Sequence, residues 1–128
     1  MSKKVRLLVI EDEKDEMKNI CYVLKEAGYE TISALDGKTG LEKAKTEKPD
    51  LIICDLNMPG LTGYEVLEEV RKAPETKHIP FIILSAFPRP DDIDMEFRVG
   101  VQEYITKPFY FKELLGRIKM CLDERESV

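Results

Sequence analysis

The polarity of the chain alternates between short apolar runs and longer stretches whose apolar residues recur every three or four positions. A short apolar run predicts a buried strand, whereas apolar residues at helical spacing predict an amphipathic helix. The predicted strands cover residues 5–10, 29–35, 51–54, 81–84 and 101–106. The predicted helices follow these strands in turn and cover residues 17–27, 37–48, 64–72, 91–99 and 112–124.

Regular alternation of strands and helices is typical of a parallel sheet with helices on both faces. We therefore predict an α/β fold of the flavodoxin-like, doubly wound type, with five parallel strands in the order 2-1-3-4-5 and five helices. We expect one domain over residues 1–124, followed by a polar tail over residues 125–128.

The composition is that of a globular domain, with 128 residues, of which 43% are apolar and 35% are charged. No apolar run approaches the roughly 20 residues of a membrane helix, so we expect no membrane span and a cytoplasmic location. The net charge of -5 argues against direct binding of nucleic acid, which depends on clustered lysines and arginines. The three cysteines lack the CxxC spacing of a metal or redox site, and we expect them to be reduced.

The third predicted strand is unusual because its apolar run ends at a carboxylate, Asp55. In open α/β sheets, ligands bind outside the carboxyl ends of the strands. Polar residues follow four of the five predicted strands: Glu11 and Asp12, Asp55, Ser85, and Lys107. In the order 2-1-3-4-5 the first and third strands are neighbours. We therefore expect the three carboxylates to share one cleft, with Ser85 and Lys107 on its far side.

Three carboxylates in one cleft repel one another and require a cation. A few carboxylate oxygens, with room left for water and phosphate, suit Mg²⁺ better than zinc or calcium. An alternative is that the acids after the first strand only cap the next helix, but this explains one acid and not three.

With Mg²⁺ bound, Asp55 could act as a nucleophile toward a phosphoryl group and form an acyl phosphate. The metal and Lys107 would neutralise charge on the transferring oxygens, and Ser85 would donate a hydrogen bond to another oxygen. The residues therefore predict phosphoryl chemistry at Asp55.

Four segments together resemble the receiver domain of two-component response regulators. They are LLVIEDE (7–13), LIICDLNMPGLTGYEVL (51–67), FIILSA (81–86) and EYITKPF (103–109). The resemblance extends from Val5 to about Asp123. It implies that Asp55 is the phosphorylation site.

The resemblance also implies a set of metal ligands. Asp12 and the main-chain carbonyl of Asn57 would join Asp55 in binding Mg²⁺, and Glu11 would act through water. Glu11 departs from the common pattern, in which an aspartate stands at this position. No other cofactor is expected.

The resemblance further implies that Lys107 and Ser85 bind the phosphoryl group, and that the Lys107-Pro108 bond is cis. Ser85 and Tyr104 would form the switch. The output face would be built from the predicted helix 91–99, strand 101–106 and helix 112–124. Tyr110 stands near the start of the last helix, where the family normally has a small polar cap.

A phosphorylation-controlled receiver would take its phosphoryl group from a histidine kinase or a phosphotransfer protein. Its output would pass to a downstream protein partner or to an effector domain outside this sequence, and a second copy of the chain is another candidate partner. Such a protein is not a turnover enzyme and catalyses only its own phosphorylation and dephosphorylation.

Three other functions are alternatives to a receiver. A pseudo-receiver that serves only as an interaction module would not need all of the polar groups that are present. A phosphatase with an aspartyl nucleophile generally carries DxD on its first strand, whereas Asp55 follows the third strand and Asn57 cannot act as a general acid. In a flavodoxin-like cofactor binder, the acidic segment EDEKDE (11–16) would repel the flavin phosphate.

Overall fold

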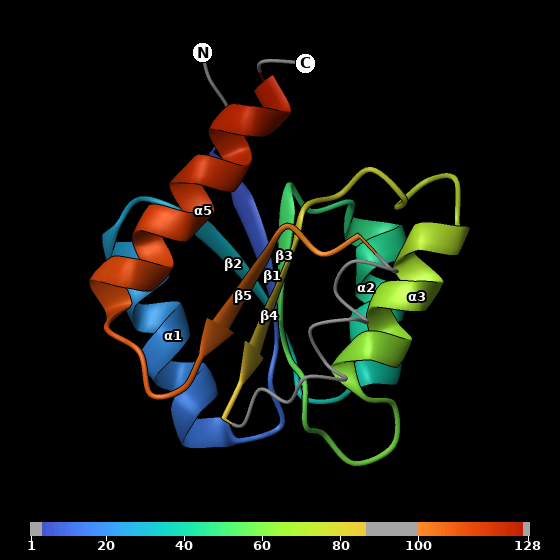
Figure 1. Ribbon diagram of the computed structural model, residues 1–128, viewed down its shortest axis with the longest axis horizontal. Coiled ribbons are helices and arrows are strands. Elements are labelled where there is room, and N and C mark those ends of the chain that lie inside the picture. The colour runs from blue at the N-terminus through green and yellow to red at the C-terminus, as the bar shows by residue number, and fades with distance from the viewer. Residues whose placement is uncertain (1–3, 87–99, 127–128) are drawn as a thin grey trace.

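A computed structural model describes residues 4–86 and 100–126, apart from the side chain of Glu126. The described chain contains five parallel strands: β1 (Arg6–Ile10), β2 (Glu30–Ala34), β3 (Leu51–Asp55), β4 (Phe81–Ser85) and β5 (Glu103–Thr106). They form one sheet in the order β2-β1-β3-β4-β5, which confirms the predicted doubly wound topology (Figure 1).

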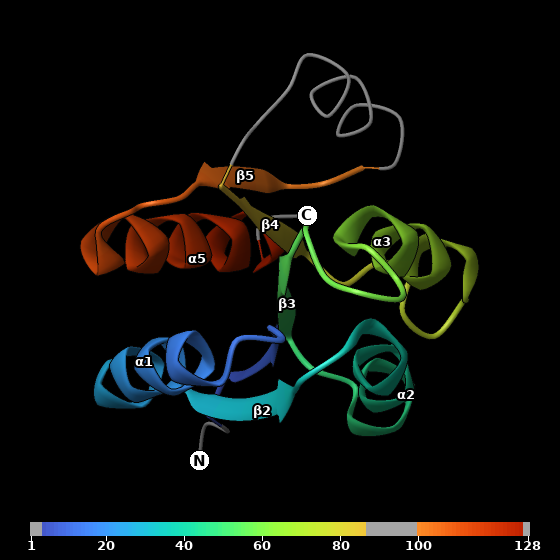
Figure 2. The same cartoon turned by 90° about the horizontal axis from the view of Figure 1, so that it is seen from below.

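Four helices lie among the described residues: α1 (Lys14–Glu26), α2 (Gly37–Glu47), α3 (Gly63–Lys72) and α5 (Phe111–Glu126). α1 and α5 cover one face of the sheet, and α2 and α3 cover the other (Figure 2). The fifth predicted helix, over residues 91–99, lies outside the described residues. No described helix is long and apolar enough to cross a membrane.

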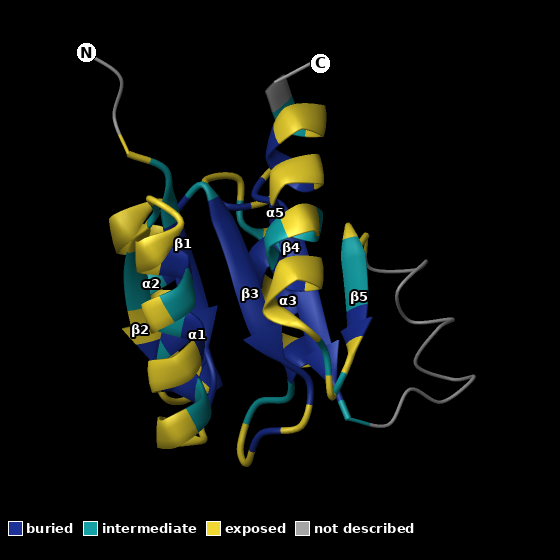
Figure 3. Cartoon of the chain, turned by 90° about the vertical axis from the view of Figure 1, so that its left-hand side faces the viewer, coloured by how far each residue is buried: buried dark blue, intermediate teal, exposed yellow. Residues whose placement is uncertain are grey.

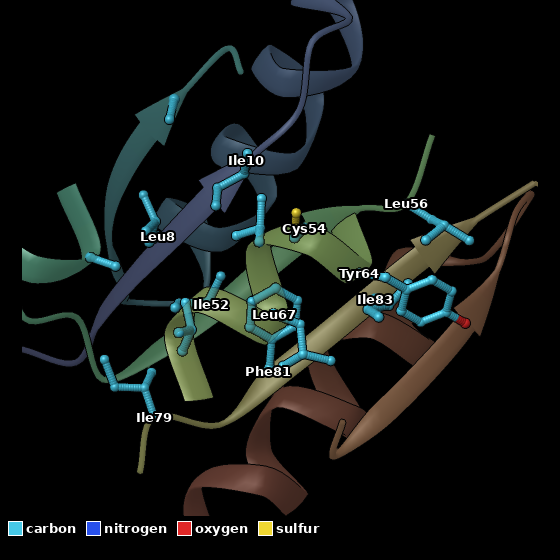
Figure 4. Packing of buried hydrophobic residues seen from close by; sticks show 14 of the residues in the cluster. Leu8, Ile10, Ile52, Cys54, Leu56, Tyr64, Leu67, Ile79, Phe81 and Ile83 are labelled. Atoms are coloured by element: carbon cyan, nitrogen blue, oxygen red, sulfur yellow. The ribbon is translucent and has the colours of Figure 1, made fainter. Parts of the chain in front are cut away.

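The central strands explain why their sequences are continuous apolar runs. Every residue of β3 and of β4 is buried, because helices cover both faces of the sheet there (Figure 3). The core accordingly has two halves. One half contains Ile52 and Ile83 with residues of α2 and α3 (Figure 4), and the other contains Ile53 and Leu84 with residues of α1 and α5.

Local hydrogen bonds mark where α3 and α5 begin. The Thr62 side chain accepts a hydrogen bond from the Glu65 N–H, and the Glu65 carboxylate accepts one from the Thr62 N–H, which forms a capping box at the start of α3. At α5, the main-chain carbonyl of Tyr110 accepts hydrogen bonds from the N–H groups of Glu113 and Leu114. A tyrosine therefore stands just before α5, where the family pattern has a small polar residue.

Arg71 at the end of α3 fixes the entry to β5. Its guanidinium donates hydrogen bonds of 2.8 Å to the Ile79 carbonyl, 2.9 Å to the Gly100 carbonyl and 2.9 Å to the Gln102 side chain. The same Gln102 oxygen accepts a hydrogen bond of 2.7 Å from the Phe81 N–H. One arginine thus ties the end of α3 to the entries of both β4 and β5.

The last helix continues into the stretch where we expected a polar tail. α5 runs to Glu126, and the Arg125 guanidinium lies 3.1 Å from the carboxylate of Asp50. Asp50 also accepts a hydrogen bond of 2.8 Å from the main-chain N–H of Arg6. The end of α5 is therefore joined to the amino-terminal edge of the sheet.

Candidate functional site

The three predicted carboxylates meet at the carboxyl edge of the sheet. Glu11, Asp12 and Asp55 each offer an oxygen, and these oxygens all lie within 4.8 Å of one another. Glu11 and Asp55 are buried, whereas Asp12 is exposed. Carboxylate oxygens are hard ligands of the kind that Mg²⁺ prefers, so this donor set fits a magnesium ion.

The sheet register brings these acids together. Ile10 of β1 pairs with Cys54 of β3, so the residues that follow, Glu11 and Asp55, leave neighbouring strands at the same level. The Glu11 N–H donates to the Ala34 carbonyl at 3.0 Å, which extends the β1–β2 pairing by one residue. The Glu11 carboxylate in turn accepts a hydrogen bond of 3.1 Å from the Glu13 N–H. Hydrogen bonds to backbone groups of Ala34 and Glu13 therefore hold the main chain and the side chain of Glu11, respectively.

Lys107 joins the cluster from the end of β5, as predicted. Its ammonium lies 3.3 Å from Asp55 Oδ1 and 3.2 Å from Glu11 Oε1. Its main-chain N–H donates to the Ser85 carbonyl at 2.7 Å, which fixes the lysine against the end of β4. The bond from Lys107 to Pro108 is cis, which confirms that expectation.

The structure also brings an acid to Lys107 that sequence reasoning missed. Glu16 Oε1, in the first turn of α1, lies 2.8 Å from Lys107 Nζ. The one available signal was helical spacing. Glu16 stands one turn before Ile20, which faces the core, so its side chain begins on the inner edge of α1.

Burial and charge act together on these groups. Burial raises the pKa of Asp55 above its usual range, although Lys107 acts in the opposite direction. Burial also raises the pKa of Glu11 to about 7, and the charge of Asp55 adds to that rise. Burial opposes the charged form of Lys107, but the hydrogen bond to Glu16 and the charges of Asp55 and Glu11 outweigh it and raise the pKa of the ammonium. The carboxylates thus outnumber the lysine, and this excess of negative charge favours a cation.

The pairing of β3 with β4 brings Ser85 near Asp55. Asp55 pairs with Leu84, so Ser85 is one residue beyond the partner of Asp55, and it is fully buried. Tyr104 on β5 pairs with Ile83 and is half-buried. Because side chains two residues apart on a strand share a face, Ser85, Ile83 and Tyr104 lie on the same face of the sheet. Both predicted switch residues therefore line one side of β4 and β5.

Asn57 is exposed and lies in the loop that follows β3, two residues after Asp55. Two neighbours of Asn57 in this loop, Leu56 and Met58, are buried and anchor it to the core. Gly60, which follows Pro59, has a φ of 79°, a left-handed conformation that glycine adopts without strain. Two buried residues thus flank Asn57, which stands two positions after Asp55.

A mainly apolar cavity of ≈ 480 Å³ opens beside Lys107. Its lining comes from α1, the end of β4, the loop after β5 and the start of α5: Glu16, Asn19, Ile20, Ala86, Lys107, Pro108, Phe109 and Phe111. Phe109 and Phe111 contact each other edge to face, with ring centroids 5.9 Å apart. Glu16 and Lys107 belong both to this cavity and to the carboxylate cluster.

Comparison with known proteins gives a consistent match. Residues 7–119 match the family described as the response regulator receiver domain. The chain is 37% identical over 126 residues to the alkaline phosphatase synthesis transcriptional regulatory protein PhoP of Bacillus subtilis, covering 98% of this chain and 51% of that protein. It is 34% identical over 117 residues to the phosphate regulon transcriptional regulatory protein PhoB of Escherichia coli, covering 91% of this chain and 51% of that protein. The chain thus spans about half the length of these curated relatives.

Solved structures agree with the sequence match. The chemotaxis protein CheY4 of Vibrio cholerae superposes with a TM-score of 0.89 at 31% identity, covering 94% of this chain and all of that one. A CheY-like response regulator receiver domain protein of Methanospirillum hungatei superposes with a TM-score of 0.92 at 27% identity, covering 98% of each chain.

Proposed function

Since the chain belongs to the response regulator receiver domain family, we propose that it accepts a phosphoryl group on Asp55 in a Mg²⁺-dependent reaction. The donor would be a histidine kinase or a phosphotransfer protein. The observation that carries this proposal is the position of Asp55, whose carboxylate lies among Glu11, Asp12 and Lys107 at the end of a buried strand.

The metal would be held by Asp12, Asp55 and the main-chain carbonyl of Asn57, with Glu11 acting through water. Bound there, Mg²⁺ supplies positive charge to the phosphoryl oxygens. The donor set supports this assignment, because all three side chains present oxygen ligands.

In the transfer step, an Asp55 carboxylate oxygen attacks phosphorus and forms a P–O bond. The P–N bond of the donor phosphohistidine breaks, and its electron pair stays on the imidazole nitrogen. Lys107 neutralises charge on the moving phosphoryl group, and the Ser85 hydroxyl donates a hydrogen bond to it. Hydrolysis of the acyl phosphate would return Asp55 to its free form, so the chain would act only on itself and not as a turnover enzyme.

The test is labelling with a small phosphodonor such as acetyl phosphate in the presence of Mg²⁺. The wild type should gain one phosphoryl group and Asp55→Asn none. Asp15→Asn is the matched control, because it changes an exposed aspartate that makes no ion pair with Lys107 among the described residues. Equal labelling of wild type and Asp55→Asn would refute the assignment. Absence of labelling in the wild type would favour the alternative, a pseudo-receiver that serves as an interaction module.

The output face is proposed to include β5 and α5; the predicted helix 91–99, its third expected part, lies outside the described residues. Ser85 and Tyr104 support the inclusion of β5, because they share one face of the adjacent strands β4 and β5. A phosphoryl group that draws the Ser85 hydroxyl inward would leave space for the Tyr104 ring to follow. Tyr110, just before α5, is 85% exposed, more than any other aromatic side chain that the structure describes.

The partner at this face would be a downstream protein, an effector domain outside this sequence, or a second copy of the chain. The tyrosine at the start of α5 supports a protein contact, because exposed aromatic side chains are enriched at interfaces. The acidic net charge of -5 does not favour direct contact with nucleic acid. The cytoplasmic location stays a prediction.

A further inference from the structure

Lys107 is surrounded by more carboxylates than phosphoryl binding requires. Its ammonium lies 2.8 Å from Glu16, 3.2 Å from Glu11 and 3.3 Å from Asp55. A lysine ammonium has three N–H donors. With three carboxylates around it, each donor has a partner. While Asp55 is still a free carboxylate, the ammonium can therefore bind an oxygen of the incoming phosphoryl group only if one carboxylate gives way.

Burial determines which carboxylate can give way. The side chains of Glu11 and Asp55 are 1% and 9% exposed, so losing the lysine would leave a buried charge without compensation. The Glu16 side chain is 32% exposed and can be hydrated when it separates from Lys107. Glu16 is therefore the partner that leaves at the lowest cost, although it makes the shortest of the three contacts.

The position of Glu16 also connects this contact to the cavity. Glu16 and Lys107 both line the cavity between α1 and the start of α5, so a group that enters it meets the ion pair directly. The carboxylate of Asp55, the proposed phosphoacceptor, is 3.3 Å from the same ammonium.

We infer that Glu16 is a positioning residue that retains Lys107 in the resting site, and that it must release Lys107 before the ammonium can bind the oxygens of the phosphoryl group that approaches Asp55. This inference rests on the proposed function. It makes Glu16 a restraint on phosphorylation, because its carboxylate competes with the phosphoryl group for the same donor. Its charge also adds to the repulsion that an anionic phosphodonor meets.

The first measurement is the rate of labelling by acetyl phosphate at saturating Mg²⁺. Glu16→Gln keeps the size of the side chain and removes the charge that holds Lys107. Its labelling should be about two- to fivefold faster than that of the wild type, the range for loss of a partly exposed ion pair. Asp15→Asn removes the same charge from the same helical turn without removing a contact to Lys107, and its rate should stay near that of the wild type.

The second measurement needs neither metal nor phosphodonor. In protein labelled with ¹⁵N-lysine, the Lys107 ammonium protons should exchange with water faster in Glu16→Gln than in the wild type, and Asp15→Asn should not change the exchange. This readout reports the contact itself, independently of phosphorylation.

The outcomes separate the two proposals. Faster labelling and faster ammonium exchange in Glu16→Gln alone would support the restraint. The restraint would be overturned if the wild type were labelled normally but Glu16→Gln were labelled more slowly than the wild type, or no faster than Asp15→Asn. The proposed function would then stay intact. No labelling of the wild type would overturn the proposed function, and with it the role of Glu16 in that reaction.

Discussion

The main-chain carbonyl of Asp55 lies directly against Gly63, the first residue of α3. A methyl group added at Gly63 would be 2.7 Å from this oxygen and 2.9 Å from the Leu56 Cα. The Gly63 N–H also donates to the Leu56 carbonyl at 2.9 Å. The start of α3 therefore packs on the backbone of the proposed phosphoacceptor, with no space for a side chain.

Gly63→Ala should destabilise the protein and displace Asp55. The methyl group would meet backbone atoms, which cannot rotate away, so the cost should be about 1–3 kcal/mol. Labelling by acetyl phosphate should also slow, because the carboxylate would move relative to Lys107. Urea unfolding and the labelling rate measure the two effects.

The matched control is Gly116→Ala in α5, where an added methyl group would have no atom within 4 Å. Alanine is the better helix former, so this variant should be more stable than the wild type by roughly 0.5–1 kcal/mol. If both variants unfolded at the same urea concentration, the close approach of Gly63 to Asp55 would be irrelevant to stability.

The metal requirement should differ between the two acids after β1. Asp12→Ala removes a proposed direct ligand, so half-maximal labelling should need at least about tenfold more Mg²⁺. Glu11→Ala should shift the requirement less, because Glu11 is proposed to act through water. A chelator should abolish labelling in every variant. A larger shift for Glu11→Ala would reverse the assignment of the two residues.

The metal-free protein should lose stability as the pH rises through the range set by Glu11. The pKa of Glu11 is raised from 4.5 to about 7 by burial. Between these values the folded state binds more protons than the unfolded state, so the free energy of unfolding falls with increasing pH. The loss is fully present above the folded-state pKa and should be on the order of 1–3 kcal/mol.

Glu11→Gln mimics the protonated acid and tests this dependence. In chelator, the variant should be more stable than the wild type at pH 8, and the difference should shrink toward pH 5. Urea unfolding at both pH values measures it. If the two proteins differed in free energy of unfolding by the same amount at both pH values, the pH dependence could not be assigned to Glu11.

Activation should reach the proposed output face. Beryllofluoride with Mg²⁺ is a stable substitute for the phosphoryl group, and its addition should shift the NMR signals of β5 and α5 in the wild type. In Tyr104→Ala the signals near the cleft should still shift, but those of β5 should respond less, because the β5 side chain that is proposed to follow Ser85 is absent. Sedimentation with and without beryllofluoride should show whether a second copy binds. Shifts confined to the cleft in the wild type would place the output surface elsewhere.

The sequence by itself determined the order of the elements and the meeting of Glu11, Asp12 and Asp55. Both follow from local patterns. A strand covered on two faces must be a continuous apolar run, and parallel strands place their carboxyl ends on one edge of the sheet. In the predicted strand order, in which β1 and β3 are neighbours, the acids after these runs therefore converge, and the structure places the three carboxylates within 4.8 Å of one another.

Only the tertiary structure decided what holds Lys107 and how closely α3 approaches Asp55. Glu16 belongs to the first helix and Lys107 to the loop after the last strand, and their contact depends on how α1 packs beside that loop. The space at Gly63 likewise depends on the angle at which α3 meets the end of β3. No local pattern encodes such distances, because they arise from packing between elements that are remote in the sequence.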